Sequence, residues 1–290
     1  MNNKRFTSSI RICACLSTLA IIAVACYDEF DPASYQPVFS ISGYTASEEI
    51  QQEALVAYWP FDGNLTETVS GVEAENSQTT FVNGFKGQAA GFNGNNPSYL
   101  LVEPSEAIIG LESFTLSFWV NATFVDADAN GSNDGILGLF ALSNPTRFWG
   151  NLEWFVENDS KETGARLKVI VAHNSELETD VLVENVQGFF DAWTNHTLTY
   201  DATTSTLTYY VNGSPRVSKT TPWTGPVQFV NSGPIVMGTA QFQTTPSLTN
   251  HGPEPWASHF TGSIDEVRIY NTALTAEEIN ALTVLQGKGK

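Results

Sequence analysis

Basic residues are scarce in this chain. Its 290 residues include 13 Lys and Arg against 31 Asp and Glu, which gives a formal net charge of −18. A protein this acidic repels nucleic-acid phosphates and anionic lipid headgroups, and no basic run in the sequence offsets the charge. We therefore expect no nucleic-acid partner, and no membrane contact based on charge.

Cysteine and long apolar runs are scarce as well. The run from Leu16 to Ala25 is too short to span a bilayer, and it follows a positively charged start, which is typical of a signal peptide. We predict a signal peptide over residues 1–25. Its removal takes away Cys13 and Cys15 and leaves Cys26 alone, so a disulfide framework is excluded.

Residues 23–26 read AVAC and resemble the lipobox of bacterial lipoproteins, although Ala23 stands where Leu is commoner. This resemblance implies that Cys26 becomes the lipidated first residue; the alternative is an ordinary secretory signal cut at Ala25. The following YDEFD resembles the acidic export signals of Bacteroidetes surface lipoproteins, or else starts a solvated linker. We therefore expect a protein held at the outer membrane by its lipid alone and exposed on the cell surface.

The rest of the chain divides into a tether, one domain and a tail. Residues 26–53 have Pro, Gly and polar residues without a sustained period, which predicts a flexible tether after the lipidated cysteine. Residues 54–285 hold short runs rich in Thr, Val, Phe and Tyr between turn residues, which predicts an antiparallel sandwich or barrel. Thr275 and Glu278 form a capping box that predicts one short C-terminal helix, and residues 286–290 are a tail.

Four segments resemble the laminin-G-like, concanavalin A-like jelly-roll family. They are LVAYWPFDGN at 55–64, SFTLSFWV at 113–120, LTYYVNG at 207–213 and GSIDEVRIY at 262–270. The resemblance implies an all-β, two-sheet antiparallel jelly-roll sandwich whose first and last strands lie side by side. It also implies a role in binding glycans or proteins, similar to the surface glycan-binding lipoproteins of Bacteroidetes polysaccharide-uptake systems.

The last predicted strand carries two adjacent acids. Asp265 is expected on one apolar face with Val267, where a carboxylate needs a partner or a metal. Asp62, just beyond the first strand, is expected to approach it, and the pair suits a structural Ca²⁺ ion, which the family resemblance also implies. The alternative is that Asp265 caps backbone amides. Glu266 and Arg268 are expected to form an exposed ion pair of little energetic value.

A second candidate calcium site lies between predicted strands. The segment 126–134 resembles an EF-hand loop, with oxygen ligands from Asp126, Asp128, Asn130 and Asp134. The residue that would close such a site is Leu137, so the bidentate carboxylate is missing. Weak calcium binding and a solvated acidic loop are both open.

The acids Glu157, Asp159 and Glu162 have the spacing of the catalytic signature of laminarinase-type glycosidases. The residues between and after them favour turns, so we predict the tip of a hairpin instead of an active site. A retaining glycosidase needs two carboxyls about 5 Å apart, one with a raised pKa. The sequence also lacks a zinc-ligand spacing, a Gly-x-Ser-x-Gly elbow and a phosphate-binding glycine loop, so we predict no catalytic residues.

Tryptophan is the clearest indication of a ligand. Sugar rings stack on exposed aromatic faces while polar side chains bind their hydroxyls. Trp223 and Trp256 lie in Pro- and Gly-rich loops. The predicted ligand-binding residues are Trp149, Trp223, His251 and Trp256; the alternative is that the loop tryptophans plug the ends of the sandwich.

These patterns favour a non-catalytic surface lipoprotein that binds an extracellular polysaccharide or oligosaccharide as an accessory to polysaccharide uptake, with outer-membrane uptake proteins as possible partners. Two alternatives remain: a protein-binding adhesin or structural surface module, and a glycoside hydrolase or lyase of the same fold. Loop tryptophans buried against the sandwich would favour the adhesin.

Overall fold

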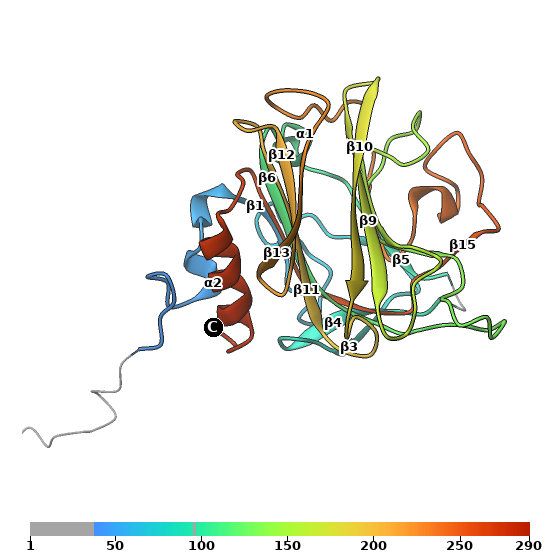
Figure 1. Cartoon of the computed structure of the whole chain (residues 1–290), viewed down its shortest axis with the longest axis horizontal. Coiled ribbons are helices and arrows are strands. Elements are labelled where there is room, and N and C mark those ends of the chain that lie inside the picture. The colour runs from blue at the N-terminus through green and yellow to red at the C-terminus, as the bar shows by residue number, and fades with distance from the viewer. Residues whose placement is uncertain (1–37, 95–96) are drawn as a thin grey trace, which may run out of the picture. The chain divides into compact units, whose positions relative to one another are not determined.

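Two β-sheets of eight strands each face one another across an apolar core in the computed structural model (Figure 1). The structure describes residues 38–94 and 97–290. The predicted signal peptide, Cys26 and the first part of the tether therefore lie outside the described residues. The unit considered below is Ser40–Lys290.

The first sheet runs in the order β13-β12-β11-β6-β16-β4-β3, with β1 paired to β16. Its strands are β1 (Leu55–Trp59), β3 (Thr80–Asn83), β4 (Gln88–Phe92), β6 (Phe114–Ala122), β11 (Thr194–Asp201), β12 (Thr206–Val211), β13 (Ser214–Thr220) and β16 (Gly262–Tyr270). The first and last strands thus lie side by side and antiparallel, as the family resemblance implied.

The second sheet runs in the order β10-β9-β8-β7-β14-β5-β2, with the short β15 paired to β7. Its strands are β2 (Glu75–Ser77), β5 (Tyr99–Val102), β7 (Ile136–Leu142), β8 (Leu152–Val156), β9 (Ala165–His173), β10 (Leu177–Val186), β14 (Ile235–Met237) and β15 (Ala257–Ser258). The crossovers between non-consecutive strands confirm the predicted jelly-roll sandwich.

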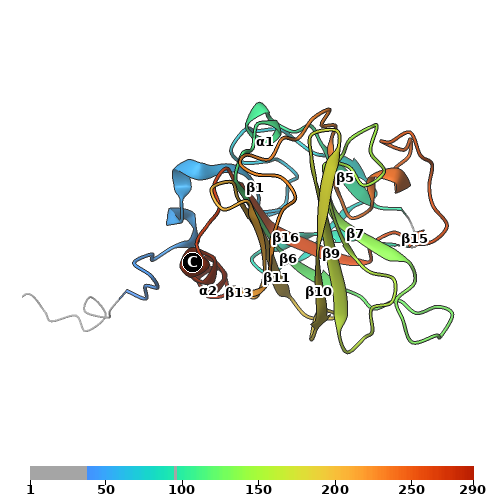
Figure 2. The same ribbon diagram turned by 45° about the horizontal axis from the view of Figure 1, so that its top comes forward.

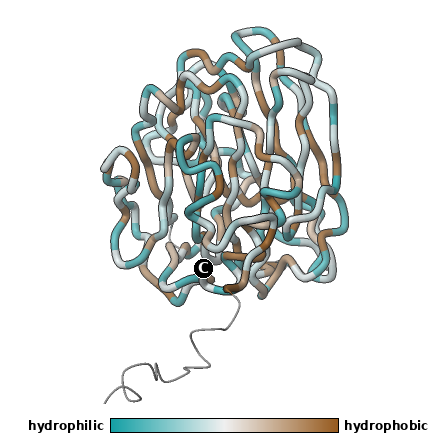
Figure 3. Tube along the Cα trace, turned by 90° about the vertical axis from the view of Figure 1, so that its left-hand side faces the viewer, coloured by the Kyte–Doolittle hydropathy of each residue, from teal (hydrophilic) through white to brown (hydrophobic). Residues whose placement is uncertain are grey.

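Alternation along the strands builds the core. Leu152, Trp154 and Val156 of β8 point inward and join the main core, so Phe155 points to the outer face of the second sheet. Figure 3 shows the same mixture of apolar and polar positions along the strands. One strand can therefore support both the core and an outer surface.

Helices cover the outer face of the first sheet only in part. α1 (Glu106–Ile109) is a single turn, and α2 (Ala276–Gln286) packs through Ile279 and Leu282 against Tyr270 of β16. The predicted capping box is present, since the Thr275 side chain accepts from the Glu278 amide and the Glu278 carboxylate accepts from the Thr275 amide. None of the described helices is long and apolar enough to cross a membrane.

Structured residues begin before position 54. The 3₁₀ turns η2 (Ser47–Glu49) and η3 (Gln52–Ala54) belong to the same unit, and Ile50 is buried beside α2. The Arg268 guanidinium donates to the Ser47 carbonyl at 3.1 Å. Residues 40–53, assigned to the tether by their composition, therefore pack onto the domain because the outer face of β16 offers them a polar partner.

A β-bulge changes the expected faces of β16. The register against β6 shifts between Asp265 and Arg268, and Glu266 adopts a positive φ of 52°. Ile264 and Val267 both lie in the main core, which the extra residue of a bulge permits. The prediction that Asp265 shares the face of Val267 is therefore wrong.

The prediction of an exposed Glu266–Arg268 pair is also wrong. Each residue is 1% exposed, because α2 and η2 cover them. Arg268 Nη2 lies 3.0 Å from Glu266 Oε2, Tyr58 donates to Glu266 Oε1 at 2.6 Å, and Gln286 donates to Glu266 Oε2 at 3.0 Å. A buried carboxylate with this many donors holds the two chain ends on the sheet.

Candidate functional site

The outer face of the second sheet carries long loops in place of a long helix. In Figure 1 the orange segment between β14 and β16 lies outside this sheet, on the side away from α2. Figure 2 shows the same arrangement after rotation. Side chains on this face are thus available for a surface site.

An aromatic cluster occupies this face. Trp149, from the β7–β8 loop, stacks on Phe155 with ring centroids 5.1 Å apart and an interplanar angle of 9°. The ring centroids of Trp256 and Trp149 are 6.0 Å apart, and those of His251 and Phe148 are 5.1 Å apart. The aromatic cluster consists of Phe148, Trp149, Phe155, Phe242, His251 and Trp256.

The cluster unites three of the four predicted ligand-binding residues. Trp149, His251 and Trp256 come from two loops far apart in sequence, and Trp256 remains 41% exposed. Trp223 does not join them. It is 4% exposed, belongs to the main core and stacks on His173 at 5.1 Å, so it matches the alternative of a tryptophan that closes the sandwich.

A cavity of about 340 Å³ adjoins the cluster and shares Phe148 and Trp149 with it. Its polar lining is centred on Arg147, whose guanidinium donates to the Ser175 carbonyl at 3.2 Å and to the Glu178 carboxylate. The lining residues are Asn144, Thr146, Arg147, Phe148, Trp149, Ser175, Glu178 and Val230. Sequence reasoning missed Arg147 and Glu178, which no motif marks.

Buried amides fix the β7–β8 loop that forms this cavity. Gln241, in the 3₁₀ turn η4 (Gln241–Gln243), donates to the carbonyls of Arg147 and Phe148 and accepts from the Asn144 amide at 2.8 Å. Asn144 donates in turn to the Val230 carbonyl at 2.8 Å. Satisfied buried amides hold a loop in one conformation, so the cavity is preorganised.

A buried carboxyl lies on the same face of the sheet. Glu153 of β8 is fully buried, and among the described residues its carboxyl oxygens have no hydrogen bond of ordinary geometry, although the Gln241 backbone amide lies near them. Burial raises the pKa of Glu153 well above its ordinary range. Because it is inaccessible, Glu153 does not contact a ligand and cannot serve as a catalytic acid here.

The glycosidase-like acids form a hairpin tip, as predicted. β8 ends at Val156 and β9 begins at Ala165, so Glu157, Asp159 and Glu162 lie in the connecting turn. Glu157 pairs with Lys168, and Asp159 pairs with Arg166. The hydrogen bond from Arg166 lowers the pKa of Asp159, which is opposite to what a catalytic acid needs.

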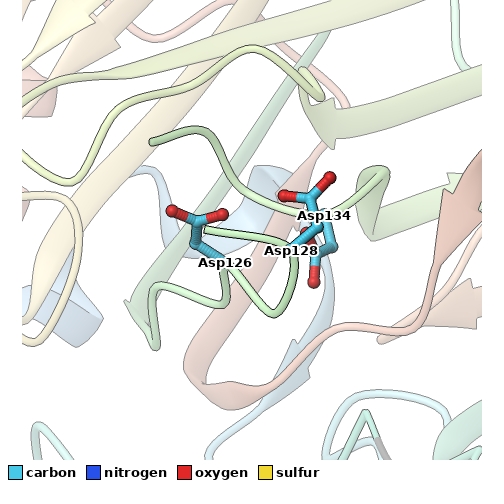
Figure 4. A group of neighbouring side chains, drawn as sticks. All are labelled: Asp126, Asp128 and Asp134. Atoms are coloured by element: carbon cyan, nitrogen blue, oxygen red, sulfur yellow. The ribbon is translucent and has the colours of Figure 1, made fainter. Parts of the chain in front are cut away.

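Asp126, Asp128 and Asp134 gather on one loop (Figure 4). Each offers a carboxylate oxygen, and these oxygens lie within 4.8 Å of one another. In residues 38–94 and 97–290 this is the one group of three or more metal-ligating side chains that lie so close together. Asp126 accepts from the Gly131 amide at 2.8 Å, and Asn130 Oδ1 accepts from the Ser132 amide. Clustered carboxylate oxygens fit a Ca²⁺ ion in chemistry and spacing.

The turn between β3 and β4 brings Asp62 and Asp265 to the same hairpin. Asp265 accepts from the Lys86 and Glu266 amides at 3.0 and 2.8 Å, and Asp62 accepts from the Gln88 amide at 2.8 Å. Both carboxylates thus cap backbone N–H groups, the alternative to a metal that the sequence left open. Burial raises the pKa of Asp265 to about 7.

The sequence model of the concanavalin A-like lectin/glucanases superfamily matches residues 93–280. No protein with a curated description matches the chain.

Solved structures with the same fold are similar at low sequence identity. The binding domain of Paraclostridial Mosquitocidal Protein 1 is 17% identical with a TM-score of 0.57, over 80% of this chain and 52% of that one. The binding domain of botulinum neurotoxin serotype G is 16% identical with a TM-score of 0.58, over 79% and 50%. The chain thus spans about half the length of these toxin domains.

A third similar structure is matched over nearly its whole length. It is domain 4 of AbnA, a GH43 extracellular arabinanase from Geobacillus stearothermophilus, in complex with arabinotriose. This domain is 17% identical with a TM-score of 0.51, over 79% of this chain and 98% of that one.

Proposed function

Because the chain belongs to the concanavalin A-like lectin/glucanases superfamily, we propose that it binds a carbohydrate without cleaving it, at the aromatic cluster and the cavity beside it. The observation that carries this proposal is the position of Trp149, which lines the preorganised polar cavity while its ring centroid lies 6.0 Å from that of the exposed Trp256. An apolar wall with a few fixed polar groups is the usual form of a small-ligand site.

The geometry suits a sugar ring. A pyranose or furanose has an apolar face that stacks on indole and hydroxyls that need charged or amide partners. Trp256 supplies an exposed indole, and the cavity supplies Arg147 and Glu178. The arabinanase domain in complex with arabinotriose supports the proposal as an example of this fold with a bound sugar.

Binding without cleavage is supported by the state of the acids. The hairpin carboxylates Glu157 and Asp159 are paired with bases, and the buried Glu153 is out of reach of a ligand. A glycoside hydrolase or lyase is therefore disfavoured. A protein-binding surface module is the second candidate, because Trp223, one of the two loop tryptophans expected at the surface, is buried.

Retention in native gels tests the proposal. The purified chain is run through gels that each contain one polysaccharide, with arabinan, β-glucan, polygalacturonate and alginate as probes. We expect slowed migration in at least one polysaccharide gel relative to a gel without polysaccharide. Migration unchanged in every gel would contradict a glycan-binding function and favour the protein-binding alternative.

We also propose that Cys26 is lipidated and anchors the protein on the outer membrane, facing outward, where it hands glycan to outer-membrane uptake proteins. This proposal rests on the AVAC sequence and the acidic segment after it. We expect Cys26→Ser to move the protein from the membrane fraction to the soluble fraction. An unchanged distribution would contradict the anchor.

Calcium is proposed at the Asp126–Asp134 loop and not between Asp62 and Asp265. The loop brings three carboxylates together with oxygens within 4.8 Å of one another, whereas Asp62 and Asp265 belong to no such group among the described residues. The ion would be structural, because a bound cation relieves the repulsion among three acids.

A further inference from the structure

We infer that the cavity beside the aromatic cluster selects neutral sugar residues and rejects anionic ones, because its one basic side chain, Arg147, is already paired with the Glu178 carboxylate. This inference rests on the proposed function and narrows it to one chemical class of ligand. Neutral means pentoses and hexoses; anionic means uronic acids, sialic acids and sulfated sugars.

Arg147 is the one basic side chain among the cavity-lining residues that the structure describes. Its Nη1 donates to the Ser175 carbonyl, its Nη2 donates to Glu178, and its Nε is buried. An arginine recognises a carboxylate through two parallel N–H groups, and here both amino groups are engaged. The charge of Arg147 is thus balanced by Glu178, and a ligand carboxylate would have to compete with Glu178 for it.

The cavity lining therefore carries no unbalanced positive charge, since Arg147 and Glu178 are its only charged residues among those that the structure describes. The Glu178 side chain is 50% exposed, and only its Oε2 contacts Arg147. The chain as a whole carries a formal charge of −18. Salt screens distant charges beyond about 8 Å, but an anionic ligand inside the cavity would meet Glu178 well within that distance. Like-charge contact at this range disfavours an anionic sugar.

A neutral sugar meets complementary groups. Glu178 Oε1 accepts from ring hydroxyls, and the Thr146 hydroxyl, which donates to Asn144 Oδ1 at 2.9 Å, has lone pairs left to accept another. Phe148 and Trp149 form the apolar side of the same cavity. The site therefore offers hydroxyl acceptors next to an aromatic wall, which matches an uncharged ring.

Variants that replace one glutamate by the neutral glutamine test the inference in the polysaccharide gels described above. We expect the natural chain to be retained by a neutral polysaccharide, arabinan or β-glucan, and not by polygalacturonate or alginate. Glu178→Gln should weaken neutral retention at least about fivefold and permit salt-sensitive retention by an anionic polysaccharide, because Arg147 is released. The matched control is Glu176→Gln, which removes the same charge from an exposed residue outside the cavity lining.

The outcomes separate this inference from the function it rests on. Retention of the natural chain by anionic polysaccharides as strongly as by neutral ones would overturn the selectivity alone. Equal effects of Glu178→Gln and Glu176→Gln would assign any selectivity to overall charge and overturn the role of the cavity. The absence of retention by any probe would overturn the carbohydrate function as well. Thermal unfolding of each variant confirms that it is folded.

Discussion

Glu153 is the least satisfied side chain on the proposed binding face. A fully buried carboxyl without donors costs about 1–3 kcal/mol when neutral, and more when charged. We expect Glu153→Met, which is apolar and similar in volume, to raise the free energy of unfolding by about 1–3 kcal/mol at pH 7 in urea denaturation.

Glu266→Met is the matched control for this change. Glu266 is as buried as Glu153 but accepts from Tyr58, Arg268 and Gln286. Its removal leaves the buried Arg268 with only the exposed Glu48 carboxylate, 3.5 Å away, and should lower the free energy of unfolding by about 3 kcal/mol. A loss of stability in Glu153→Met would show that its carboxyl has a partner in solution.

Asp265 gives stability a pH dependence with a defined sign. Its pKa is raised from 3.8 to about 7 in the folded protein, so the folded state binds the proton more tightly than the unfolded state. The contribution of this group to stability is present below the unfolded pKa and is lost as pH rises towards 7. We expect Asp265→Asn to flatten the fall in stability between pH 4 and pH 7, measured by urea denaturation.

The same fall in Asp265→Asn and in the natural chain would contradict the assignment to Asp265. Glu153 acts in the same direction, since its pKa is also raised, so the double variant with Glu153→Met should show the smallest change with pH.

The exposure of a single side chain could be predicted only where its sequence neighbours alone determine its environment. Trp256 follows two prolines and faces solvent as its loop suggests, whereas Trp223 follows Pro222 in a similar loop and is buried on His173. Local sequence does not reveal a stacking partner 50 positions away. Arg147 and Glu178 carried no signal, because their pairing depends on the approach of the β7–β8 loop to the start of β10.

At the scale of elements, the acidic loop after β6 makes the calcium proposal testable. Three carboxylates within 4.8 Å repel one another unless a cation is present. We expect added Ca²⁺ to raise the melting temperature relative to chelator-treated protein, since a ligand at about 100 times its Kd adds about 2.7 kcal/mol.

Asp128→Asn should reduce this calcium effect, while Glu162→Gln, an exposed acid on the β8–β9 hairpin, should leave it unchanged. Equal melting temperatures with calcium and with chelator in the natural chain would contradict a calcium site in this loop.

Elements with strong local patterns were predictable. The turn residues of the 157–164 hairpin and the capping box of α2 both predicted the structure correctly. The bulge in β16 was not predictable, because the sequence around Asp265 and Glu266 is equally compatible with a regular strand and with a bulged one. The turns η2 and η3 were missed because a buried arginine on β16, 221 positions from Ser47, holds them in place.

At the scale of the whole molecule, the outer faces of the two sheets are covered by different segments of the chain. The first sheet is partly covered by α2 and residues 40–54, which tie both ends of the unit to β16 through Glu266 and Arg268. The second sheet leaves room for the aromatic cluster and its cavity. The jelly roll followed from sequence pattern and family resemblance, but this division of faces needed the coordinates.

The aromatic cluster is the centre of this account, and truncation of its exposed indole tests it most directly. Affinity for the polysaccharide that retains the natural chain best is measured by isothermal titration for the natural chain, Trp256→Ala and Phe81→Ala. Phe81 is the control, an aromatic residue of similar exposure (38%) on the edge strand β3 of the other sheet. We predict at least about tenfold weaker binding by Trp256→Ala, or 1.4 kcal/mol, with Phe81→Ala unchanged. Equal affinity of Trp256→Ala and the natural chain would contradict a binding site at the aromatic cluster.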